Sequence, residues 1–399
     1  MVNLETIKQA QERINGVVVK TPLAYAPYLS ELTAANIYLK KENLQITGAF
    51  KIRGAYNKIA SLSDAERAKG VIAASAGNHA QGVALSASRF GMKAVIVMPE
   101  STPLTKVNGV KHYGAEVVLH GSNYDEAYGY AKKYAEKNDL TFVHPFEDAE
   151  VIAGQGTVGL EVLEMCEELD AIVVPIGGGG LIAGIATATK ALSPNTKVIG
   201  VSASGAPAFK NSFELKTAVD TTKVRTIADG IAVRDTSKIT LDYALKYVDE
   251  VISVDDEEIA SAILYLLERQ KLVVEGAGAV GVAALLHDKI KEIQGKNVAV
   301  VLSGGNMDVT LLSVIIEKGL IKSHRKMNLT VTLIDKPGSL MRFTEILKEL
   351  NANIVHIAYD RTSVSLDYGD ANVTVHIETK GKEHQDEIYE ALKSEGYIR

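Results

Sequence analysis

The feature that most constrains the fold is a regular alternation of short apolar segments with longer amphipathic ones, which begins near residue 70. The apolar segments predict strands at Val71–Ala74, Ala94–Met98, Glu116–Leu119, Ala171–Ile176, Lys197–Val201 and Val298–Leu302. Helices are predicted before and between them, at residues 4–15, Lys51–Ala60, His79–Phe90, Leu104–His112 and Tyr124–Lys137. Strands that alternate with helices form parallel sheets with both faces covered. Because the alternation is interrupted near 140–155, we predict an α/β fold with two parallel-sheet lobes.

The composition of the chain fits a soluble globular protein. Its 399 residues can hold two or three domains, with 46% apolar and 23% charged residues. A net charge of −6 gives no reason to expect a nucleic acid or an anionic membrane as a partner. The single cysteine, Cys166, predicts a reducing compartment, and Met1–Lys20 lacks the apolar core of a signal peptide. We therefore expect a cytoplasmic protein, in which Cys166 is a buried residue on a helix.

One uncharged run, Ala171–Thr189, is long enough to suggest a membrane helix. Four consecutive glycines and Pro175 lie within it. Since glycine and proline interrupt helices, a strand, a glycine loop and a helix explain the run better.

The pattern changes near residue 322. Lys322, His324, Arg325 and Lys326 predict a short basic linker. After it we predict strands at Leu329–Ile334, Ile354–Asp360 and Ala371–Glu378 and helices at Ser339–Leu350 and His384–Glu395, with a short last strand. This order, βαββαβ, is the split βαβ pattern of a small α+β domain.

Three glycine-bearing loops follow predicted strands, at Ser75–His79, Gly177–Gly180 and Ser303–Asn306. In a parallel sheet, ligands bind beyond the carboxyl ends of the strands, where these loops lie. The four consecutive glycines carry the most information, because N–H groups without a neighbouring Cβ can approach an anion closely and the start of the next helix adds positive potential. A single loop of this kind is also explained by an ordinary turn. Three of them favour a phosphate-bearing ligand.

Lys51 stands in small or apolar surroundings, after Gly48, Ala49 and Phe50. A lysine amine that is deprived of water has a lowered pKa and can form Schiff bases with carbonyl compounds, including pyridoxal phosphate. Taken alone, the stretch is more typical of a surface lysine in the first turn of a helix. Together with the phosphate loops, it favours a carbonyl cofactor that bears a phosphate.

A second glycine pattern, Gly276–Gly281, matches dinucleotide-binding loops, and Leu272–Glu275 resembles the strand that would precede it. Such a site also requires an acidic residue at the end of the next strand, where this chain has Ser303. We therefore do not expect a nicotinamide cofactor.

Four motifs, in this order, resemble those of a known family: Thr-Gly-Ala-Phe-Lys, Ser-Ala-Gly-Asn-His-Ala-Gln-Gly, Gly-Gly-Gly-Gly-Leu and Ser-Gly-Gly-Asn. The family is the threonine and serine dehydratases of the fold-type II pyridoxal-phosphate enzymes. The resemblance implies pyridoxal phosphate as the cofactor. It also implies a catalytic domain of residues 1–321, with a smaller lobe at roughly 45–145.

The resemblance further implies roles for individual residues. Lys51 would bind the cofactor and remove the substrate Cα proton, Asn78 would hydrogen-bond the phenolic oxygen, and Ser303 would contact the pyridine nitrogen. Phe50 and Gly230 would flank the ring. The phosphate would be held by Gly177, Gly178, Gly179, Gly180 and Leu181, and the substrate carboxylate by Ser75, Ala76, Gly77, Asn78 and His79. Since a serine leaves the ring nitrogen unprotonated, the ring would be a weaker electron sink, which favours β-elimination.

At some positions this sequence differs from the family pattern, and these differences limit the activities and binding sites that we expect. Serine racemases of this family carry a second serine where this chain has Ala76, so racemisation is not expected. Those relatives also bind a divalent cation through a glutamate where this chain has Ser202, so no metal site is expected. The role of Glu275, in a loop that reaches the active site of relatives, is left open. His79 is predicted to shape its loop rather than to act as a base.

Residues 325–399 resemble an ACT-type regulatory module, through Asp335–Leu340 after the first strand and Asn353-Ile354 at the second. Such modules usually pair and bind an amino acid at the strand–helix loop. The resemblance therefore implies a homo-oligomer, a dimer or tetramer, with isoleucine or a nucleotide as effector. A module that only mediates oligomerisation is the alternative.

The sequence thus predicts an enzyme that converts L-threonine to 2-oxobutanoate and ammonia and also acts on L-serine. L-Serine dehydration as the main activity is the nearest alternative. A non-catalytic amino-acid sensor, built around the C-terminal module, is an alternative of another class. Isoleucine biosynthesis and threonine degradation are both open as the physiological role.

Overall fold

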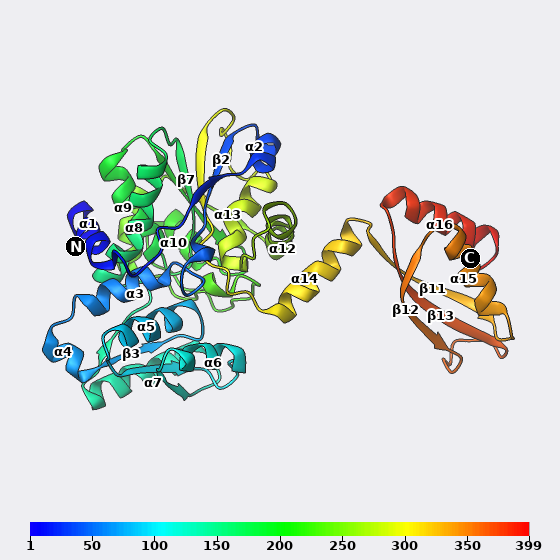
Figure 1. Cartoon of the computed structure of the whole chain (residues 1–399), viewed down its shortest axis with the longest axis horizontal. Coiled ribbons are helices and arrows are strands. Elements are labelled where there is room, and N and C mark those ends of the chain that lie inside the picture. The colour runs from blue at the N-terminus through cyan, green and yellow to red at the C-terminus, as the bar shows by residue number, and fades with distance from the viewer. Residues whose placement is uncertain (399) are drawn as a thin grey trace. The chain divides into compact units, whose positions relative to one another are not determined.

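The computed structural model describes residues 1–398, which pack as two compact units, one of residues 1–308 and one that begins at Val309 (Figure 1). The first unit contains a six-stranded sheet and a four-stranded sheet. The second contains a three-stranded sheet.

The six-stranded sheet has the order β1-β2-β10-β7-β8-β9. All neighbouring strands run parallel except β1, which is antiparallel to β2. The central strand β7 is buried on both faces, since Ile172 and Val174 pack against Ile182 and Ile185 of α9 while Val173 faces α13. Its strands are β1 (Leu23–Tyr25), β2 (Asn36–Lys40), β7 (Ala171–Pro175), β8 (Lys197–Ala203), β9 (Glu250–Val254) and β10 (Asn297–Val301).

The four-stranded sheet is parallel throughout and has the order β5-β4-β3-β6. One face packs against α5 through Val83 and Ala87, and the other packs against α7 through Ala127 and Ala131. Strands covered on both faces are expected to be continuously apolar, as β3 and β4 are. The strands are β3 (Val71–Ala74), β4 (Ala94–Met98), β5 (Glu116–Leu119) and β6 (Thr141–Phe142). The prediction of two parallel-sheet lobes is confirmed.

The helices of the first unit cover these sheets and connect their strands. They are α1 (Leu4–Ile14), α2 (Pro27–Thr33), η1 (Glu42–Leu44), α3 (Lys51–Ala60), α4 (Asp64–Lys69), α5 (Asn78–Arg89), α6 (Leu104–His112), α7 (Tyr124–Asn138), α8 (Ala149–Met165), α9 (Gly180–Leu192), α10 (Ala208–Leu215), η2 (Asp229–Ile231), α11 (Lys238–Tyr247), α12 (Asp256–Tyr265), η3 (Leu266–Gln270) and α13 (Gly276–Leu286).

Helix α8 packs backbone to backbone against α3 on one side and α9 on the other. A Cβ atom at Gly154 would lie 2.5 Å from the Arg53 carbonyl oxygen, and one at Gly184 would lie 2.5 Å from the Ile152 carbonyl oxygen. Only glycine permits such an approach, so Gly154 lets α3 lie directly against α8 and Gly184 does the same for α9. Because α3 begins at Lys51, this packing also sets the place of the candidate catalytic lysine.

The second unit is a βαββα arrangement preceded by α14 (Val309–Lys322). Its antiparallel sheet has the order β11-β13-β12, and one face packs on α15 and α16 through Phe343, Leu347 and Ile388. The elements are β11 (Lys326–Ile334), α15 (Ser339–Glu349), β12 (Asn353–Asp360), β13 (Asp370–Glu378) and α16 (Lys382–Ser394).

Three sequence predictions need correction, and one resemblance to a strand does not hold. Residues 322–326 are not a linker, because α14 ends at Lys322 and β11 begins at Lys326 after a turn. No strand follows α16 in residues 395–398, so the described part of the module is βαββα. Cys166 is half-buried and caps the C-terminus of α8 just after Met165, rather than being a buried helical residue. Leu272–Glu275, which resembled a strand, is irregular.

The uncharged run Ala171–Thr189 forms β7, the glycine loop and part of α9, as predicted. Within residues 1–398, no helix has both the length and the apolar character that crossing a membrane requires.

Candidate active site

A cavity of about 550 Å³ lies among the loops that follow β3, β7 and β10, between the two sheets of the first unit. The structure brings every predicted cofactor and substrate residue to its wall. These residues are Phe50, Lys51, Ser75, Ala76, Gly77, Asn78, His79, Gly177, Gly178, Gly179, Gly180, Leu181, Gly230 and Ser303. Their individual roles stay predictions, but their convergence makes this cavity the candidate active site.

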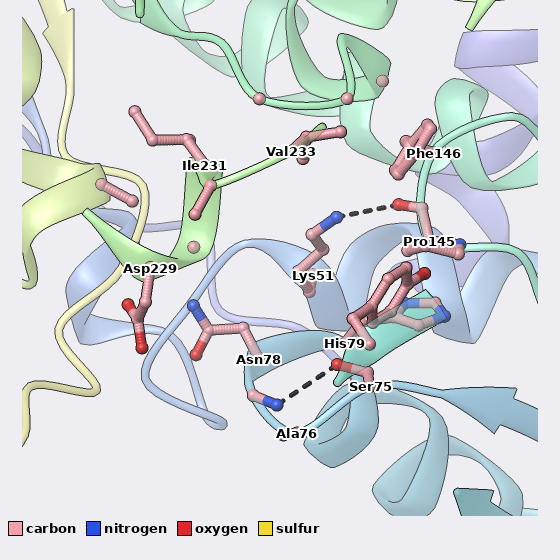
Figure 2. A pocket seen from close by; sticks show the side chains of 18 of the residues that line it. Lys51, Ser75, Ala76, Asn78, His79, Pro145, Phe146, Asp229, Ile231 and Val233 are labelled. Atoms are coloured by element: carbon pink, nitrogen blue, oxygen red, sulfur yellow. Dashed lines mark hydrogen bonds between the residues drawn. The ribbon is translucent and has the colours of Figure 1, made fainter. Parts of the chain in front are cut away.

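Lys51 is the first residue of α3, and its side chain points into the cavity toward Pro145 (Figure 2). Its Nζ donates a hydrogen bond to the Pro145 carbonyl oxygen at 2.8 Å and lies 5.3 Å from the centre of the Phe50 ring. Loss of hydration lowers the pKa of Lys51 to about 8, and the Glu275 carboxylate opposes this shift. A lysine in this state is neutral often enough near neutral pH to act as a nucleophile or base.

The four glycines form a cradle with no room for side chains. A Cβ atom at Gly178 would lie 2.4 Å from the Phe146 ring, and one at Gly177 would lie 2.7 Å from Ile231 Cα. Gly179 has a φ of +82° and caps α9 without a side chain. The N–H groups of Gly177 and Gly178 donate to no acceptor among residues 1–398. Free N–H groups at a helix N-terminus suit a phosphate, so the cradle fits the phosphate of pyridoxal phosphate.

The loop Ser75–His79 leads into the N-terminus of α5. The Gly77 N–H donates to Ser75 Oγ at 3.2 Å, which tightens the turn (Figure 2). His79 is buried, and its Nε2 is 2.8 Å from the Val143 carbonyl oxygen. Burial, together with the charge of Lys51, lowers the pKa of His79 to about 3. Since this imidazole is neutral and engaged with the backbone, its contacts support a role in shaping the loop.

Backbone contacts join the Thr-Gly-Ala-Phe-Lys motif to the Ser-Gly-Gly-Asn motif. The Phe50 N–H donates to the Ser303 carbonyl oxygen at 3.0 Å, and Ala49 forms an isolated bridge with Gly304. Ser303 is buried at the end of β10. Phe50 and Ser303 are thus held side by side at the cavity wall, although they are far apart in the sequence.

Sequence reasoning assigned no role to two polar residues beside Asn78, Glu275 and Asn306. Asn78 Nδ2 donates to Glu275 Oε1 at 2.6 Å, and Asn306 Nδ2 donates to Asn78 Oδ1 at 2.7 Å. Burial raises the pKa of Glu275 to about 7, and the nearby Asp229 adds to this rise. Asn306 is the last residue of the Ser-Gly-Gly-Asn motif, and that position was the only signal for it in the sequence.

The segment His144–Glu147 also lines the cavity, and it falls where the sequence indicated only a boundary between sheets. Its Pro145 carbonyl oxygen contacts Lys51, and its Phe146 ring covers the glycine cradle. Burial lowers the pKa of His144 to about 4, although Glu147 opposes the shift. The segment that interrupts the alternation of strands and helices therefore forms one wall of the cavity.

Two ion pairs join the lobes at the cavity wall. Lys106 of α6 lies 2.9 Å from Asp229 of η2, and Arg234 lies 2.9 Å from Asp125 of α7. All four residues line the cavity. The opposite charges of these four residues offset one another.

Behind Lys51 lies a buried ion cluster that the sequence did not reveal. Arg53 pairs with Glu42 at 2.8 Å and with Glu161 at 2.6 Å, and Lys40 pairs with Glu161 at 2.5 Å. Arg53, Lys40 and Glu42 are fully buried. Burial raises the pKa of Glu42, but Arg53 more than offsets that effect and holds the pKa below its ordinary value. The cluster ties α3 to β2, η1 and α8.

No metal site emerges from the described part of the chain. Residues 1–398 contain no group of three or more His, Cys, Asp or Glu side chains placed to hold a metal ion. Ser202, which stands where racemases of the family have a glutamate, donates from Oγ to the Ile252 carbonyl oxygen at 3.2 Å.

The fold and the cavity define a class of protein. The family of pyridoxal-phosphate dependent enzymes matches residues 14–304, and this chain belongs to that family. It has the fold-type II architecture and depends on pyridoxal phosphate, as the motifs predicted. The dinucleotide-like pattern Gly276–Gly281 instead forms the start of α13.

Three individual proteins of known name are similar to this chain. The chain is 49% identical to the L-threonine ammonia-lyase of Thermotoga maritima over 397 residues, which is 100% of this chain and 98% of that protein. It is similar to the processed form of threonine deaminase isoform 2 from Solanum lycopersicum, with 39% identity, a TM-score of 0.75, and coverage of 79% of this chain and 86% of that one. It is also similar to maize serine racemase, with 36% identity, a TM-score of 0.76, and coverage of 81% of this chain and 99% of that one.

Proposed function

We propose that the chain is a cytoplasmic L-threonine ammonia-lyase that converts L-threonine to 2-oxobutanoate and ammonia. The observation that carries the proposal is the 49% identity to the Thermotoga maritima enzyme of that name, which extends over the whole of this chain. The cavity adds support, since it combines a desolvated lysine with a phosphate cradle. A cytoplasmic location rests on the single cysteine.

The residues of the cavity would divide the work of holding the cofactor. Lys51 would bind its aldehyde carbon, Gly177–Gly180 its phosphate, and Ser303 its ring nitrogen. When bound, pyridoxal phosphate supplies an electron sink for negative charge at the substrate Cα. The N-terminus of α5, reached through Ser75–His79, would attract the substrate carboxylate, because helix N-termini carry positive potential.

Lys51 would also act as the general base. Its pKa of about 8 lets the amine take the Cα proton near neutral pH. Loss of that proton and of the β-hydroxyl group leaves an enamine, which water hydrolyses to 2-oxobutanoate and ammonia. L-Serine would give pyruvate by the same route, so L-serine dehydration is the nearest alternative as the main activity.

Ala76 is the residue that argues against racemisation as an activity of this protein. A racemase needs a proton donor on the second face of the substrate, and a methyl group cannot supply one. Ala76 lines the cavity beside Ser75. The likeness to maize serine racemase in fold is therefore compatible with an enzyme that eliminates and does not racemise.

The test is an assay of the purified protein with L-threonine and L-serine. We expect a yellow protein that releases ammonia with 2-oxobutanoate or pyruvate and forms little D-serine. D-Serine formed as fast as pyruvate would contradict the role given to Ala76. A colourless protein that binds amino acids without turnover would favour the alternative, a non-catalytic sensor.

We further propose that the second unit regulates the enzyme as an ACT-like module. Every cavity residue lies at or before Asn306, so the module is free for another role. The turn from β11 to α15 ends at Gly338, with a φ of +91° and no side-chain cap on the helix. Asp335 in this turn accepts hydrogen bonds from Tyr359 at 2.9 Å and Arg361 at 3.0 Å. An amino-acid carboxylate suits such a helix start, with isoleucine as our first choice and a nucleotide as the second.

The module also offers a means of oligomerisation. β12 is an edge strand, and Val355, Ile357 and Tyr359 on it are 42% to 46% exposed. An edge strand with exposed apolar side chains is suited to pairing with another copy. We therefore propose a homo-oligomer, a dimer or tetramer.

Removing the module should separate chemistry from control. A variant that ends at Ser323, after α14, should keep its cofactor and turnover but lose any response to isoleucine. Typical coupling energies shift apparent affinity about 5- to 150-fold, which steady-state assays with and without isoleucine would detect. A full response in the truncated variant would place the effector site in the catalytic unit. Loss of both activity and oligomeric mass would show that the module serves assembly.

A further inference from the structure

The amide of Asn78 is held at both ends by side chains from distant parts of the chain. Asn306 Nδ2 donates to Asn78 Oδ1 at 2.7 Å, and Asn78 Nδ2 donates to Glu275 Oε1 at 2.6 Å. All three residues line the cavity. An asparagine side chain rarely has both its polar ends engaged with other side chains, since most side-chain hydrogen bonds go to backbone or water.

The direction of the Asn78 amide follows from a backbone carbonyl. Asn306 Nδ2 also donates to the Thr47 carbonyl oxygen at 2.7 Å, and a carbonyl can only accept. The Asn306 group that faces Asn78 is therefore the NH₂ group, and its partner on Asn78 must be the oxygen. The NH₂ group of Asn78 then faces Glu275, whichever protonation state Glu275 has.

This direction leaves one N–H group of Asn78 available to a ligand. Of its two N–H bonds, one points to Glu275, and no hydrogen bond among the described residues uses the other. A reversed amide would place the Asn78 carbonyl oxygen opposite the phenolic oxygen of the cofactor. Both atoms are hydrogen-bond acceptors, so they would repel each other. Asn78 can thus serve the cofactor only while its amide keeps this orientation.

Asn306 itself fits into a slot that the first motif leaves open. A Cβ atom at Gly48 would lie 2.4 Å from Asn306 Oδ1, and Gly48 has a φ of +71°. The glycine of one motif and the asparagine of another are therefore complementary in shape. This fit places the Asn306 amide between Thr47 and Asn78.

We infer that Asn306 is a positioning residue, which acts through Asn78 by holding its amide with an N–H group toward the cofactor. The inference rests on the proposed binding of pyridoxal phosphate in this cavity. It assigns to the last residue of the Ser-Gly-Gly-Asn motif a role separate from that of Ser303, which lies on the wall at the end of β10.

A double-mutant cycle on the full-length protein tests the inference. Asn306→Ala, Asn78→Ala and the double variant are stripped of cofactor, and the dissociation constant for pyridoxal phosphate and the absorption maximum are measured on reconstitution. We expect Asn306→Ala to weaken binding about 10- to 100-fold and to shift the absorption maximum in the same direction as Asn78→Ala. In the Asn78→Ala background, Asn306→Ala should have little further effect, because its partner is gone.

Two further variants keep the result interpretable. Asn306→Asp preserves the shape of the side chain but removes its donors, so it should weaken binding at least as much as Asn306→Ala, and it replaces the alanine variant if that one fails to fold. Asn36→Ala is the matched control, since it removes another asparagine–asparagine bond, 3.0 Å long, on the protein surface. It should leave both cofactor measurements unchanged.

Two results would overturn the inference. One is an unchanged dissociation constant and absorption maximum in both Asn306 variants. The other is an Asn306→Ala effect of full size in the Asn78→Ala background, which would show that Asn306 acts by another route. Failure of the unmodified protein to bind pyridoxal phosphate would instead overturn the proposed function.

Discussion

Replacing Lys51 with alanine should remove the visible absorption band of the bound cofactor and nearly all turnover. The amine is both the attachment point and the proposed base, and its pKa of about 8 fits it for both tasks. Loss of a general base alone lowers rates by about 10²- to 10⁴-fold, so the combined loss should lie at or beyond the upper end of that range. Absorption spectra and steady-state assays with L-threonine measure the two effects.

Borohydride reduction gives a direct check on the attachment point. The reduced protein should carry the pyridoxyl group on Lys51, as peptide mapping would show. Lys8→Ala is the matched control, because Lys8 is an exposed residue of α1 and should retain full activity and colour. A label on a lysine other than Lys51 would refute the assignment of the catalytic residue.

The second large effect concerns stability. Arg53→Met should destabilise the protein by about 3–5 kcal/mol, because it leaves the buried carboxylates of Glu42 and Glu161 without their main cationic partner. Lys40 forms its ion pair with Glu161, and its charge acts on Glu42 less strongly than that of Arg53, so it would offset only part of the loss. Urea denaturation, followed by circular dichroism at neutral pH, would measure the fall in the unfolding midpoint.

The same substitution at Arg13 provides the comparison. Arg13 pairs with Glu150 at 2.8 Å, but its side chain is 35% exposed, so Arg13→Met should cost less than about 1 kcal/mol. If Arg53→Met were no more destabilising than Arg13→Met, the buried cluster would have no stabilising role.

Much of the first unit could be predicted because its signals are local. A run such as Ala94–Met98 is apolar throughout, which fixes a strand covered on both faces, and the bounds of this strand agree with the structure. The glycine motifs also carry their meaning locally, since a phosphate cradle needs consecutive residues without Cβ atoms. The order of strands within the two sheets has no such local signal.

The missed features depend on contacts between distant residues. Arg53 meets Glu161 only because α3 and α8 pack closely at Gly154, and neither sequence neighbourhood indicates the other. Glu275 was noticed as a candidate, but its partner Asn78 lies in another motif. The linker at 322–326 was wrongly predicted because a cluster of basic residues describes a solvated surface as well as a flexible segment.

The four-stranded sheet is an insertion into the larger one, since β3 to β6 come between β2 and β7 in the chain. The polypeptide therefore passes between the lobes twice. Lys51 follows the first crossing and Pro145 precedes the second, and the two meet at 2.8 Å. The amine proposed as the catalytic base thus lies where the chain crosses between the two lobes. Because the buried ion cluster ties α3 to β2 and α8, a rotation of the small lobe would move the Ser75–His79 loop relative to this amine, so that opening for substrate and alignment for proton transfer would be one event.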